Sequence, residues 1–432
     1  MSENMAALTP RTPCIVSAVR TPLGAFQGAL SSYTAMELGA FAIRGALERA
    51  GVRPEDVDEV IFGNVISANL GQAPATQAAL GAGLPPSTPC TLVNKVCSSG
   101  LKAVMLAAQA IMASSADVIV AGGMESMSNA PHYLPGARKG LRLGDGSVVD
   151  GLVKDGLWDP YGNIHMGSCA EMCADRFAVG RQQQDEHALQ SHRRAVAAAA
   201  AGYTAAEVVP VPRPGGGGGP GSYIWEDESL SKMDPVRLTA LKPYFRRDGG
   251  TVTAGNASPM TDGAAALVIA SYEAVQRLGL PLLAAVRGFA DAAQSPEWFT
   301  TAPALAVPRA LKHAGLTSAS DVDYWEVNEA FSVVDLVNRQ LLGLPAERVN
   351  VFGGSVALGH PIGASGARIL VTLLNVLRSR GGRRGCAAIC NGGGGASSIV
   401  VEAMPPPLDK QQQQQQQLPT AAAAMTRQQS QL

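Results

Sequence analysis

The chain of 432 residues repeats itself in a fixed order, and this constrains its fold more than any other feature. Residues 46–52, Ala-Leu-Glu-Arg-Ala-Gly-Val, return at 310–316 as Ala-Leu-Lys-His-Ala-Gly-Leu. Each copy is followed by Asp-Val-Asp and a strand-like run that leads to an asparagine, Asn64 or Asn328. Two later pairs keep the same order: Ser-Gly at 99–100 and 365–366, and glycine-ended apolar runs at 120–123 and 389–393. The sequence therefore predicts two copies of one unit.

Within each copy, apolar runs alternate with helix-forming segments. In the first copy we expect strands at 13–20, 57–65, 90–93 and 117–123, and helices at about 34–50, 74–81 and 101–112. This alternation is typical of a layered α/β fold.

Residues 124–250 interrupt this rhythm inside the first copy. The segment mixes loops (131–158), two predicted helices (170–176 and 183–200) and a five-glycine run (215–219); regular order is expected again from 251–258 and in a strand at 265–270. A long irregular excursion in a compact protein usually serves a site. The predicted layout is a first half (1–280) with an insertion at about 124–250, a second half (281–403) and a disordered Gln/Ala-rich tail (404–432).

Composition excludes several classes of function. The formal net charge is −1 with both signs interspersed, which argues against nucleic acid and anionic membrane surfaces as partners. No apolar run is long enough to span a bilayer, and the first ten residues lack the pattern of a secretory leader. Seven cysteines without a framework spacing suit a reducing compartment, so we expect a cytoplasmic protein. A terminal Ser-Gln-Leu, loosely similar to a peroxisomal address, leaves the peroxisome as a minor alternative.

One cysteine falls where a loop becomes a helix. Cys97 follows a short strand and precedes the helix-forming run that begins near Leu101. Free N–H groups and the helix macrodipole at such a position stabilise a thiolate, which predicts an activated nucleophile. A small buried apolar residue at a helix start explains this stretch equally well.

The repeat places three further polar side chains in corresponding loops. His360 lies in the glycine-lined stretch 353–363, ahead of a predicted helix, where it is a candidate base for Cys97. A lone histidine is more often structural, but flanking glycines imply a close backbone approach. Cys390 ends a strand before Asn-Gly-Gly-Gly-Gly and is a second candidate thiol, while Asn328 ends another strand and is a candidate for orienting an oxygen.

Two weaker patterns have simpler explanations. His165, Cys169 and Cys173 share a helical spacing, but three ligands on one straight face seldom converge, so no metal site is predicted. A basic stretch follows the glycine run and is either a solvated face or a phosphate contact: Lys232, Arg237, Lys242, Arg246 and Arg247.

Four motifs together resemble the active-site signatures of the thiolase superfamily, in family order. They are Asn-Lys-Val-Cys-Ser-Ser-Gly (94–100), Asn-Glu-Ala-Phe (328–331), Gly-His-Pro-Ile-Gly (359–363) and Cys-Asn-Gly-Gly-Gly (390–394). The resemblance runs from about residue 13 to 403 and is strongest to the biosynthetic acetoacetyl-CoA thiolases of plants and algae. It implies a five-layer αβαβα fold of two similar five-stranded halves, with the insertion over the active site.

The resemblance also implies a reaction, the condensation of two acetyl-CoA molecules to acetoacetyl-CoA through an acetyl-cysteine. Cys97 would carry the acetyl group, His360 would be its base, and Cys390 would remove the α-proton of the second acetyl-CoA. His360 and a water held by Asn328 would stabilise the enolate oxygen, and the N–H groups of Cys97 and Gly392 would hold the oxyanion formed on the acetylated sulfur.

Further implications concern ligands and assembly. Contacts to coenzyme A would come from Lys232, Arg237, Ser258, His165 and Met166. No separate cofactor is expected, because coenzyme A is part of the substrate. Relatives that bind potassium use a tyrosine where this chain has His192, and imidazole is a poor ligand for a hard cation, which argues against potassium. A homotetramer is expected.

Two alternatives share the fold. A longer-chain 3-ketoacyl-CoA thiolase keeps the same catalytic set and differs in pocket shape. A thiolase-like lipid-binding protein without catalysis typically lacks part of the set, whereas Cys97, His360 and Cys390 are all present here.

Overall fold

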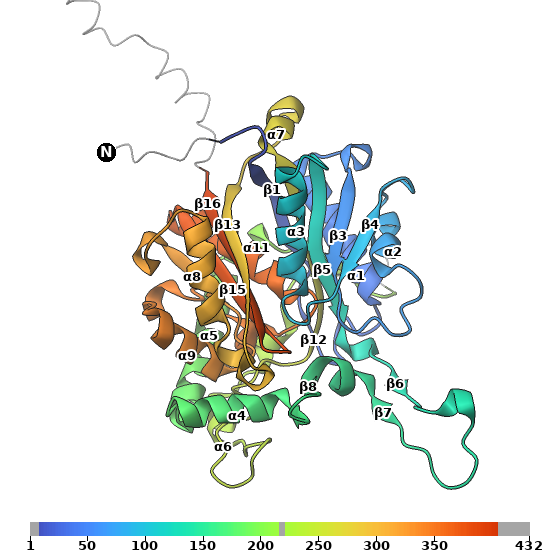
Figure 1. The fold of residues 1–432 in the computed structure, drawn as a ribbon, viewed down its shortest axis with the longest axis vertical. Coiled ribbons are helices and arrows are strands. Elements are labelled where there is room, and N and C mark those ends of the chain that lie inside the picture. The colour runs from blue at the N-terminus through green and yellow to red at the C-terminus, as the bar shows by residue number, and fades with distance from the viewer. Residues whose placement is uncertain (1–7, 216–220, 405–432) are drawn as a thin grey trace, which may run out of the picture.

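The computed structural model describes residues 8–215 and 221–404 (Figure 1). The predictions for the first seven residues, most of the glycine run, the tail and its terminal tripeptide lie outside these described residues.

A ten-stranded sheet runs through the described part of the molecule, in the order β14-β15-β16-β13-β1-β12-β5-β3-β4, with β2 paired to β12. The first half supplies β1 (Pro13–Arg20), β2 (Gly24–Ala25), β3 (Glu59–Gly63), β4 (Cys90–Val93), β5 (Val118–Ser126) and β12 (Thr261–Ser271). The second supplies β13 (Ala284–Ala293), β14 (Tyr324–Val327), β15 (Arg384–Asn391) and β16 (Gly395–Ala403). Only two residue pairs, from β1 to β13, join the two half-sheets.

The two halves repeat each other outward from this seam. β1, β12, β5 and β3 of the first half correspond to β13, β16, β15 and β14 of the second. The next position is β4 in the first half, whereas in the second it is a single bridge between Trp325 and Val349. The predicted repeat is confirmed, but the expectation of five strands in each half is wrong for the second half.

Helices complete the layers. They are α1 (Ala35–Ala50), α2 (Pro74–Gly81), α3 (Ser99–Met112), α4 (Met166–Arg176), α5 (Arg181–Ala200), α6 (Pro235–Ala240), α7 (Tyr272–Leu278), α8 (Pro303–His313), α9 (Ser332–Leu342), α10 (Ser355–Leu358) and α11 (Ser365–Arg380). The helices α3 and α11, which both open with Ser-Gly, contact each other and pack between the inner faces of the two half-sheets. Helices α1 and α2 cover the outer face of the first half-sheet, and α8 covers that of the second. This gives the predicted five layers.

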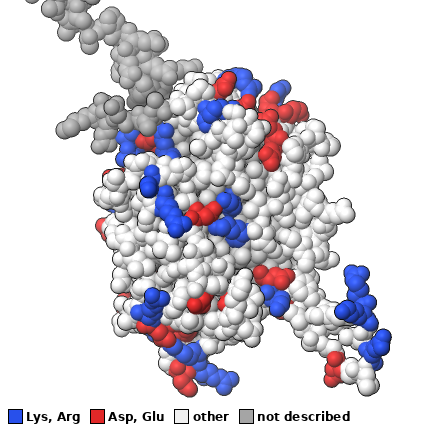
Figure 2. Space-filling model, viewed as in Figure 1, with Lys and Arg blue, Asp and Glu red and all other residues white. Residues whose placement is uncertain are grey.

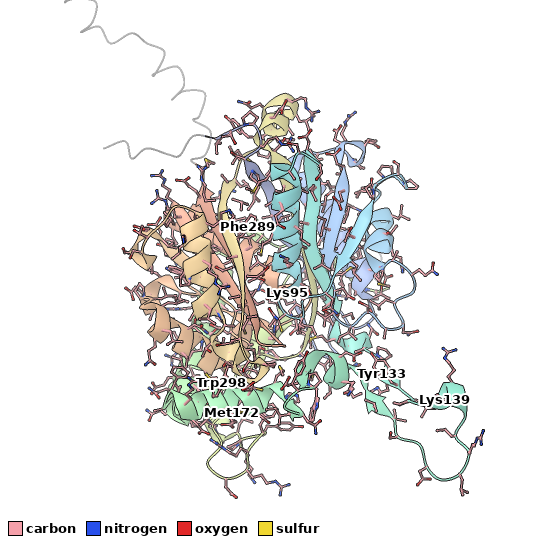
Figure 3. All side chains as sticks on the ribbon, in the orientation of Figure 1. Lys95, Tyr133, Lys139, Met172, Phe289 and Trp298 are labelled. Carbon is pink, nitrogen blue, oxygen red and sulfur yellow. The ribbon has the colours of Figure 1, made fainter. Side chains whose placement is uncertain are left out.

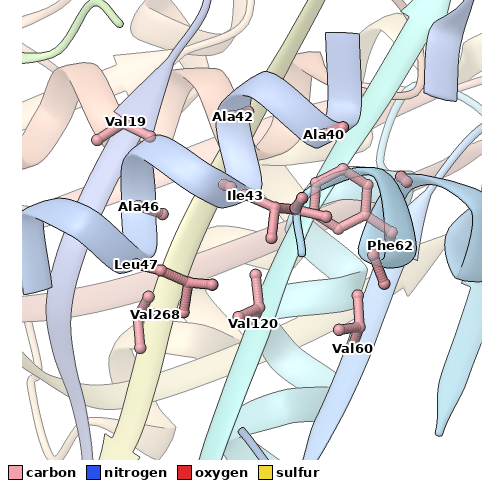
Figure 4. Close-up of a cluster of buried hydrophobic side chains, with 14 of the residues drawn as sticks. Val19, Ala40, Ala42, Ile43, Ala46, Leu47, Val60, Phe62, Val120 and Val268 are labelled. Carbon is pink, nitrogen blue, oxygen red and sulfur yellow. The ribbon is translucent and has the colours of Figure 1, made fainter. Parts of the chain in front are cut away.

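The strand β12 shows how the sequence produces these layers. Its side chains alternate between the two faces. Ala266 and Val268 belong to the cluster under α1, where Figure 4 shows Val268, while Leu267 and Ile269 join the central helices. Three successive alanines (264–266) precede Leu-Val-Ile (267–269), and their small side chains allow helices to approach both faces. A buried strand of this kind has no polar face, which is why it reads as a continuous apolar run.

Several predicted boundaries change. The strand β3 is shorter than 57–65, while β5 and β12 extend beyond 117–123 and 265–270. Residues 251–260 form neither helix nor strand apart from a one-residue bridge, so the expectation that regular order resumes at 251 is wrong. Buried polar side chains rather than a ladder organise this segment: Asn256 accepts from the N–H of Thr253 and donates to Asp185.

The insertion is fixed to the body by buried ions. Arg20, fully buried at the end of β1, pairs with Glu207 at 2.7 Å and with both carboxylate oxygens of Asp227 at 2.7 and 2.9 Å. Short strand pairs occur along the insertion: β6 (His132–Tyr133) with β7 (Val149–Asp150), β8 (Trp158–Asp159) with β9 (Ile164–His165), and β10 (Val211–Pro212) with β11 (Tyr223–Ile224). The segment between β6 and β7 forms an arm that projects from the body (Figure 1).

Charged side chains are interspersed over the face shown in Figure 2, as the sequence indicates. Among the described residues, none of the helices is both long and apolar enough to cross a membrane.

Candidate active site

The loop before α3 holds Cys97 in a constrained position. Val96 has a φ of +48°, which is strained for a β-branched residue and costs on the order of 1–3 kcal/mol. Neighbouring side chains hold this conformation: Asn94 accepts from the N–H of Val96 at 3.0 Å, and the Ser99 hydroxyl accepts from the N–H of Lys95 and donates to the Val96 carbonyl. Cys97 is half-buried and lies two residues before the helix.

The hairpin of β15 and β16 brings Cys390 and Gly392 to the same place. The backbone N–H of Gly392 lies within hydrogen-bonding reach of the Cys97 sulfur, as does the N–H of Cys97 itself. Ser98 donates to Asn391 at 2.8 Å and so ties the two loops together. Cys390 is 1% exposed, and its thiol interacts electrostatically with that of Cys97. The two thiols, distant in sequence, therefore lie close together.

His360 is held by the close backbone approach that its flanking glycines predict. Gly359 has a φ of +113°, and a Cβ added there would lie 2.1 Å from the Thr261 hydroxyl. The N–H of Gly363 donates to buried Glu125 of the first half at 2.9 Å. Ile362, between them, packs in one apolar cluster that includes Val65 and is lined by Cys97. The His360 loop thus lies against the Cys97 loop.

Hydrogen bonds assign the tautomer of His360. Ser365 donates its only hydroxyl proton to the Pro361 carbonyl at 2.9 Å, so it accepts from Nδ1–H of His360 at 2.5 Å. Nε2 then carries a free lone pair, and this buried atom has no hydrogen-bond partner among the described residues. A neutral imidazole with a bare Nε2 is the form that a general base requires.

Asn328 is oriented in a similar way. It follows β14 directly, and its Oδ1 accepts from Ser355 at 2.6 Å, whose hydroxyl in turn accepts from buried Arg368 at 2.8 Å. Its buried Nδ2 finds no acceptor within the described part of the chain. Because a buried amide without a partner is costly, this N–H group is available for a substrate oxygen or a water.

Burial dominates the titration of the site. It raises the pKa of Cys97 to about 12, although the N–H groups of Gly392 and Cys97 act in the opposite direction. Burial also raises the pKa of Cys390 well above its ordinary value and lowers that of His360 to about 3, with the charge of Arg368 adding to the effect on His360. The prediction of a resting thiolate is therefore wrong: the loss of hydration raises the pKa of Cys97 more than the backbone N–H groups lower it. The resting state is a neutral imidazole with two thiols.

Comparisons with known proteins decide the family. Residues 14–273 match the N-terminal domain of thiolase and residues 280–403 match its C-terminal domain. The chain belongs to the thiolase family.

This thiolase is similar to proteins that are named for their activity. It is 58% identical over 392 residues to acetyl-CoA acetyltransferase 2 of Arabidopsis thaliana, covering 91% of this chain and 97% of that protein. It is 54% identical over 378 residues to a cytosolic acetyl-CoA acetyltransferase of Gibberella zeae, covering 88% of this chain and 95% of that protein. A crystal structure of Acat5 thiolase from Ascaris suum in complex with coenzyme A superposes with a TM-score of 0.86 at 44% identity, covering 91% of this chain and all of that one.

Of the residues expected to contact coenzyme A, Met166 lies close to Gly392 and Cys390 in this thiolase, and His165 precedes it in the chain. A Cβ added to Gly392 would lie 3.7 Å from the Met166 sulfur, and Met166 shares an apolar cluster with Cys390. His165 caps α4 by accepting from the N–H of Gly167 at 3.0 Å and stacks on Phe245. His165 is therefore a capping residue, a role that its helical spacing with Cys169 does not reveal.

All five expected contacts with coenzyme A stay predictions. Ser258 bonds to the Ala330 carbonyl at 2.8 Å, two residues after Asn328. Lys232 pairs with Glu228 at 2.7 Å on an exposed segment of the insertion, and Arg237 is exposed on the short helix α6. His192 on α5 is partly buried, and burial lowers its pKa.

Sequence reasoning missed the residues that hold this thiolase's candidate site. These are Lys95, Ser98, Ser355, Ser365, Arg368 and Glu125. The strongest available signal was Ser365, which opens a helix five residues after His360. The others join segments that are distant in sequence, so their partners emerge only from the fold.

Proposed function

We propose that the protein is an acetyl-CoA C-acetyltransferase that joins two acetyl-CoA molecules to acetoacetyl-CoA and coenzyme A, and that catalyses the reverse thiolysis. The family assignment and the names of relatives at 51–58% identity support this activity. The single observation that carries the mechanism is the meeting of the half-buried Cys97 thiol and the buried Cys390 thiol at one glycine-rich hairpin.

In the first half-reaction, Cys97 attacks the thioester carbon of acetyl-CoA. Its proton passes to Nε2 of His360 as the C–S bond forms, because neither group is ionised beforehand. The N–H groups of Cys97 and Gly392, which point at this sulfur, stabilise the oxyanion. The leaving thiolate of coenzyme A takes the proton of Cys390. The products are acetyl-Cys97, free coenzyme A, an imidazolium and the Cys390 thiolate.

In the second half-reaction, the Cys390 thiolate removes an α-proton from a new acetyl-CoA. Burial raises the pKa of Cys390, which makes its thiolate a stronger base for a weakly acidic C–H bond. The His360 imidazolium and a water held by Nδ2 of Asn328 stabilise the enolate oxygen. The enolate carbon then attacks acetyl-Cys97, and the departing sulfur recovers its proton from His360. Both thiols and the neutral imidazole are thereby restored.

Mass spectrometry tests the covalent step. After brief exposure to acetoacetyl-CoA, we expect one acetyl group on the peptide that contains Cys97, and none in a Cys97→Ser variant. A Cys97→Ser variant with unchanged turnover would instead support the lipid-binding alternative.

Chain-length preference separates this proposal from a longer-chain thiolase. We expect turnover of acetoacetyl-CoA to exceed that of a ten-carbon 3-ketoacyl-CoA at equal concentration. The reverse preference would favour the longer-chain activity, which the names of the relatives do not favour.

We further propose that the protein is a cytoplasmic homotetramer that needs neither a cofactor nor potassium. The arm between β6 and β7 supports self-association, because it exposes Leu134, Leu141, Val148 and a fully exposed Leu143 outside the body (Figure 3 labels Lys139 there). Replacing residues 134–148 by a short glycine-serine linker should lower the mass measured by light scattering. An unchanged mass would remove this role from the arm. A fluorescent fusion tests the location, and activation by potassium would overturn the argument from His192.

A further inference from the structure

Two side chains, Ser98 and Lys95, fix the loop that carries the proposed nucleophile to the other half of the molecule. Lys95, two residues before Cys97, lies at the seam between the halves (Figure 3). Its ammonium donates to Asp291 of β13 at 2.7 Å and, on β16, to the Ser397 hydroxyl at 2.8 Å and the Ala396 carbonyl at 3.2 Å. The Lys95 ammonium thus directs all three of its N–H donors to acceptors in the second half.

The register of the hairpin shows what these contacts position. Ala396 is the cross-strand partner of Cys390, and Ser397 is the partner of Ile389. The ammonium therefore binds β16 directly opposite Cys390, while Cys97 follows Lys95 by two residues in the chain. The Ser98 to Asn391 hydrogen bond ties the same two loops one residue beyond Cys97.

The strain at Val96 makes this anchor matter. A β-branched residue at φ +48° persists only where its surroundings hold it on both sides. On the far side are Ser98 and Ser99 at the helix start, and on the near side the side chain of Lys95 is the tie to the second half. If that tie is lost, the loop can relax, and the Cys97 sulfur moves relative to Cys390.

We propose that Lys95 is a positioning residue that sets the separation of the Cys97 and Cys390 sulfurs by linking the nucleophile loop to β16. The inference rests on the roles proposed for these two thiols. Lys95 touches neither thiol in the described contacts, and Asp291 balances its charge, so it acts through geometry.

The chain supplies a matched control. Lys102 on α3 binds the other oxygen of the same Asp291 at 2.7 Å but lies on a regular helix beyond the loop. Lys95 and Lys102 are similarly exposed, at 26% and 23% of the side chain. In a Lys95→Met variant, Asp291 keeps Lys102 and the Ser397 hydroxyl, so no buried carboxylate is left unpaired and the fold should persist.

Kinetics supply the first readout. Because a shift on the order of 1 Å at reacting groups costs about a hundredfold in rate, we expect Lys95→Met to lower kcat by roughly ten- to a hundredfold. The KM for acetoacetyl-CoA should change by less than about twofold, since the expected coenzyme A contacts are elsewhere. Lys102→Met should retain at least half of kcat. Ser397→Ala, which removes one acceptor, should lose activity in the same direction by a smaller factor and serves if Lys95→Met does not fold.

Cross-linking supplies a readout of position. Dibromobimane, which bridges neighbouring thiols, should join Cys97 to Cys390 in the wild type and in Lys102→Met, with the product identified by peptide mass spectrometry. The yield should fall severalfold in Lys95→Met at an unchanged melting temperature. Equal losses in both lysine variants, a loss confined to KM, or an unchanged cross-link yield would each overturn the proposal. Cross-linking reports position whether or not the thiols catalyse, whereas a fully active Cys390→Ser variant would count against the proposed function instead.

Discussion

Replacing Ser365 by alanine tests the assignment of His360 as the base. The Ser365 hydroxyl accepts a hydrogen bond from Nδ1–H of His360 at 2.5 Å and donates one to the Pro361 carbonyl. These two bonds fix both the orientation and the tautomer of the ring. Both residues are buried, and alanine adds no atom that can clash. The variant leaves a buried Nδ1–H without an acceptor at the moment when the ring becomes positively charged.

The magnitude follows from the charge that develops in the reaction. A hydrogen bond to a charged group contributes about 1.5–3 kcal/mol, whereas one to a neutral ring contributes about 1 kcal/mol. Most of the loss therefore appears in the transition state, where His360 is an imidazolium. The loss in kcat/KM is the difference between these two contributions, about 0.5–2 kcal/mol, so at 1.36 kcal/mol for each factor of ten we expect kcat/KM for thiolysis to fall by about two- to thirtyfold.

A double-mutant cycle identifies the route of the effect. On a His360→Gln background the same Ser365→Ala change should cost less than about twofold, because the ring through which Ser365 acts is gone. Ser17→Ala is the matched control, since Ser17 is buried in β1 with a hydroxyl that has no partner among the described residues. Activity within twofold of the wild type, or equal losses on both backgrounds, would refute the assignment of the tautomer and of the base.

Three further predictions concern ionisation. Because the pKa of Cys97 is raised to about 12 and that of His360 is lowered to about 3, both groups stay neutral from pH 6 to 9. With His360 as base, the rate at which iodoacetamide alkylates Cys97 should be nearly constant over this range, whereas in His360→Ala it should rise about tenfold per pH unit. A sigmoid centred near pH 6.5 in the wild type would contradict this. Burial raises the pKa of Glu125 from 4.5 to about 7, so the folded state holds this proton more tightly and loses about 3 kcal/mol as the pH rises through this window; the stability deficit of Glu125→Gln in urea should shrink between pH 4.5 and 7.5, and a constant deficit would refute it. Arg20→Met strands the buried carboxylate of Asp227 and should lower the free energy of unfolding by about 3–5 kcal/mol, whereas a loss below 1 kcal/mol in urea titration would show that the pair is dispensable.

Local pattern predicted much of the fold because local causes produce it. The helix α1 begins and ends where its Thr34 capping box and the left-handed Gly51 require, and α3 and α11 begin at their Ser-Gly pairs. The strand β12 begins before its apolar run because Thr261 and Asp262 find polar partners at its start. Such partners are set by tertiary structure, so a propensity argument starts the strand too late.

The candidate site divides in the same manner. Cys97, His360, Cys390 and Asn328 stand beside glycines or strand ends, where local signals exist. Their protonation is a different matter: a helix terminus is visible in the sequence, but the depth of burial that opposes it is not. For Cys97 the effect of burial on the pKa is larger than that of the backbone N–H groups, so the resting group is a thiol rather than a thiolate.

The position of β12 has a consequence for biosynthesis. This strand pairs with β1 on one side and β5 on the other, yet residues 127–260 must leave the ribosome before it exists. At ordinary rates of elongation this delay lasts on the order of ten seconds, during which β1 and β5 present unpaired apolar edges. A nascent chain halted at residue 260 should therefore recruit holding chaperones. A longer chain from which β12 has emerged should no longer need them for the first half.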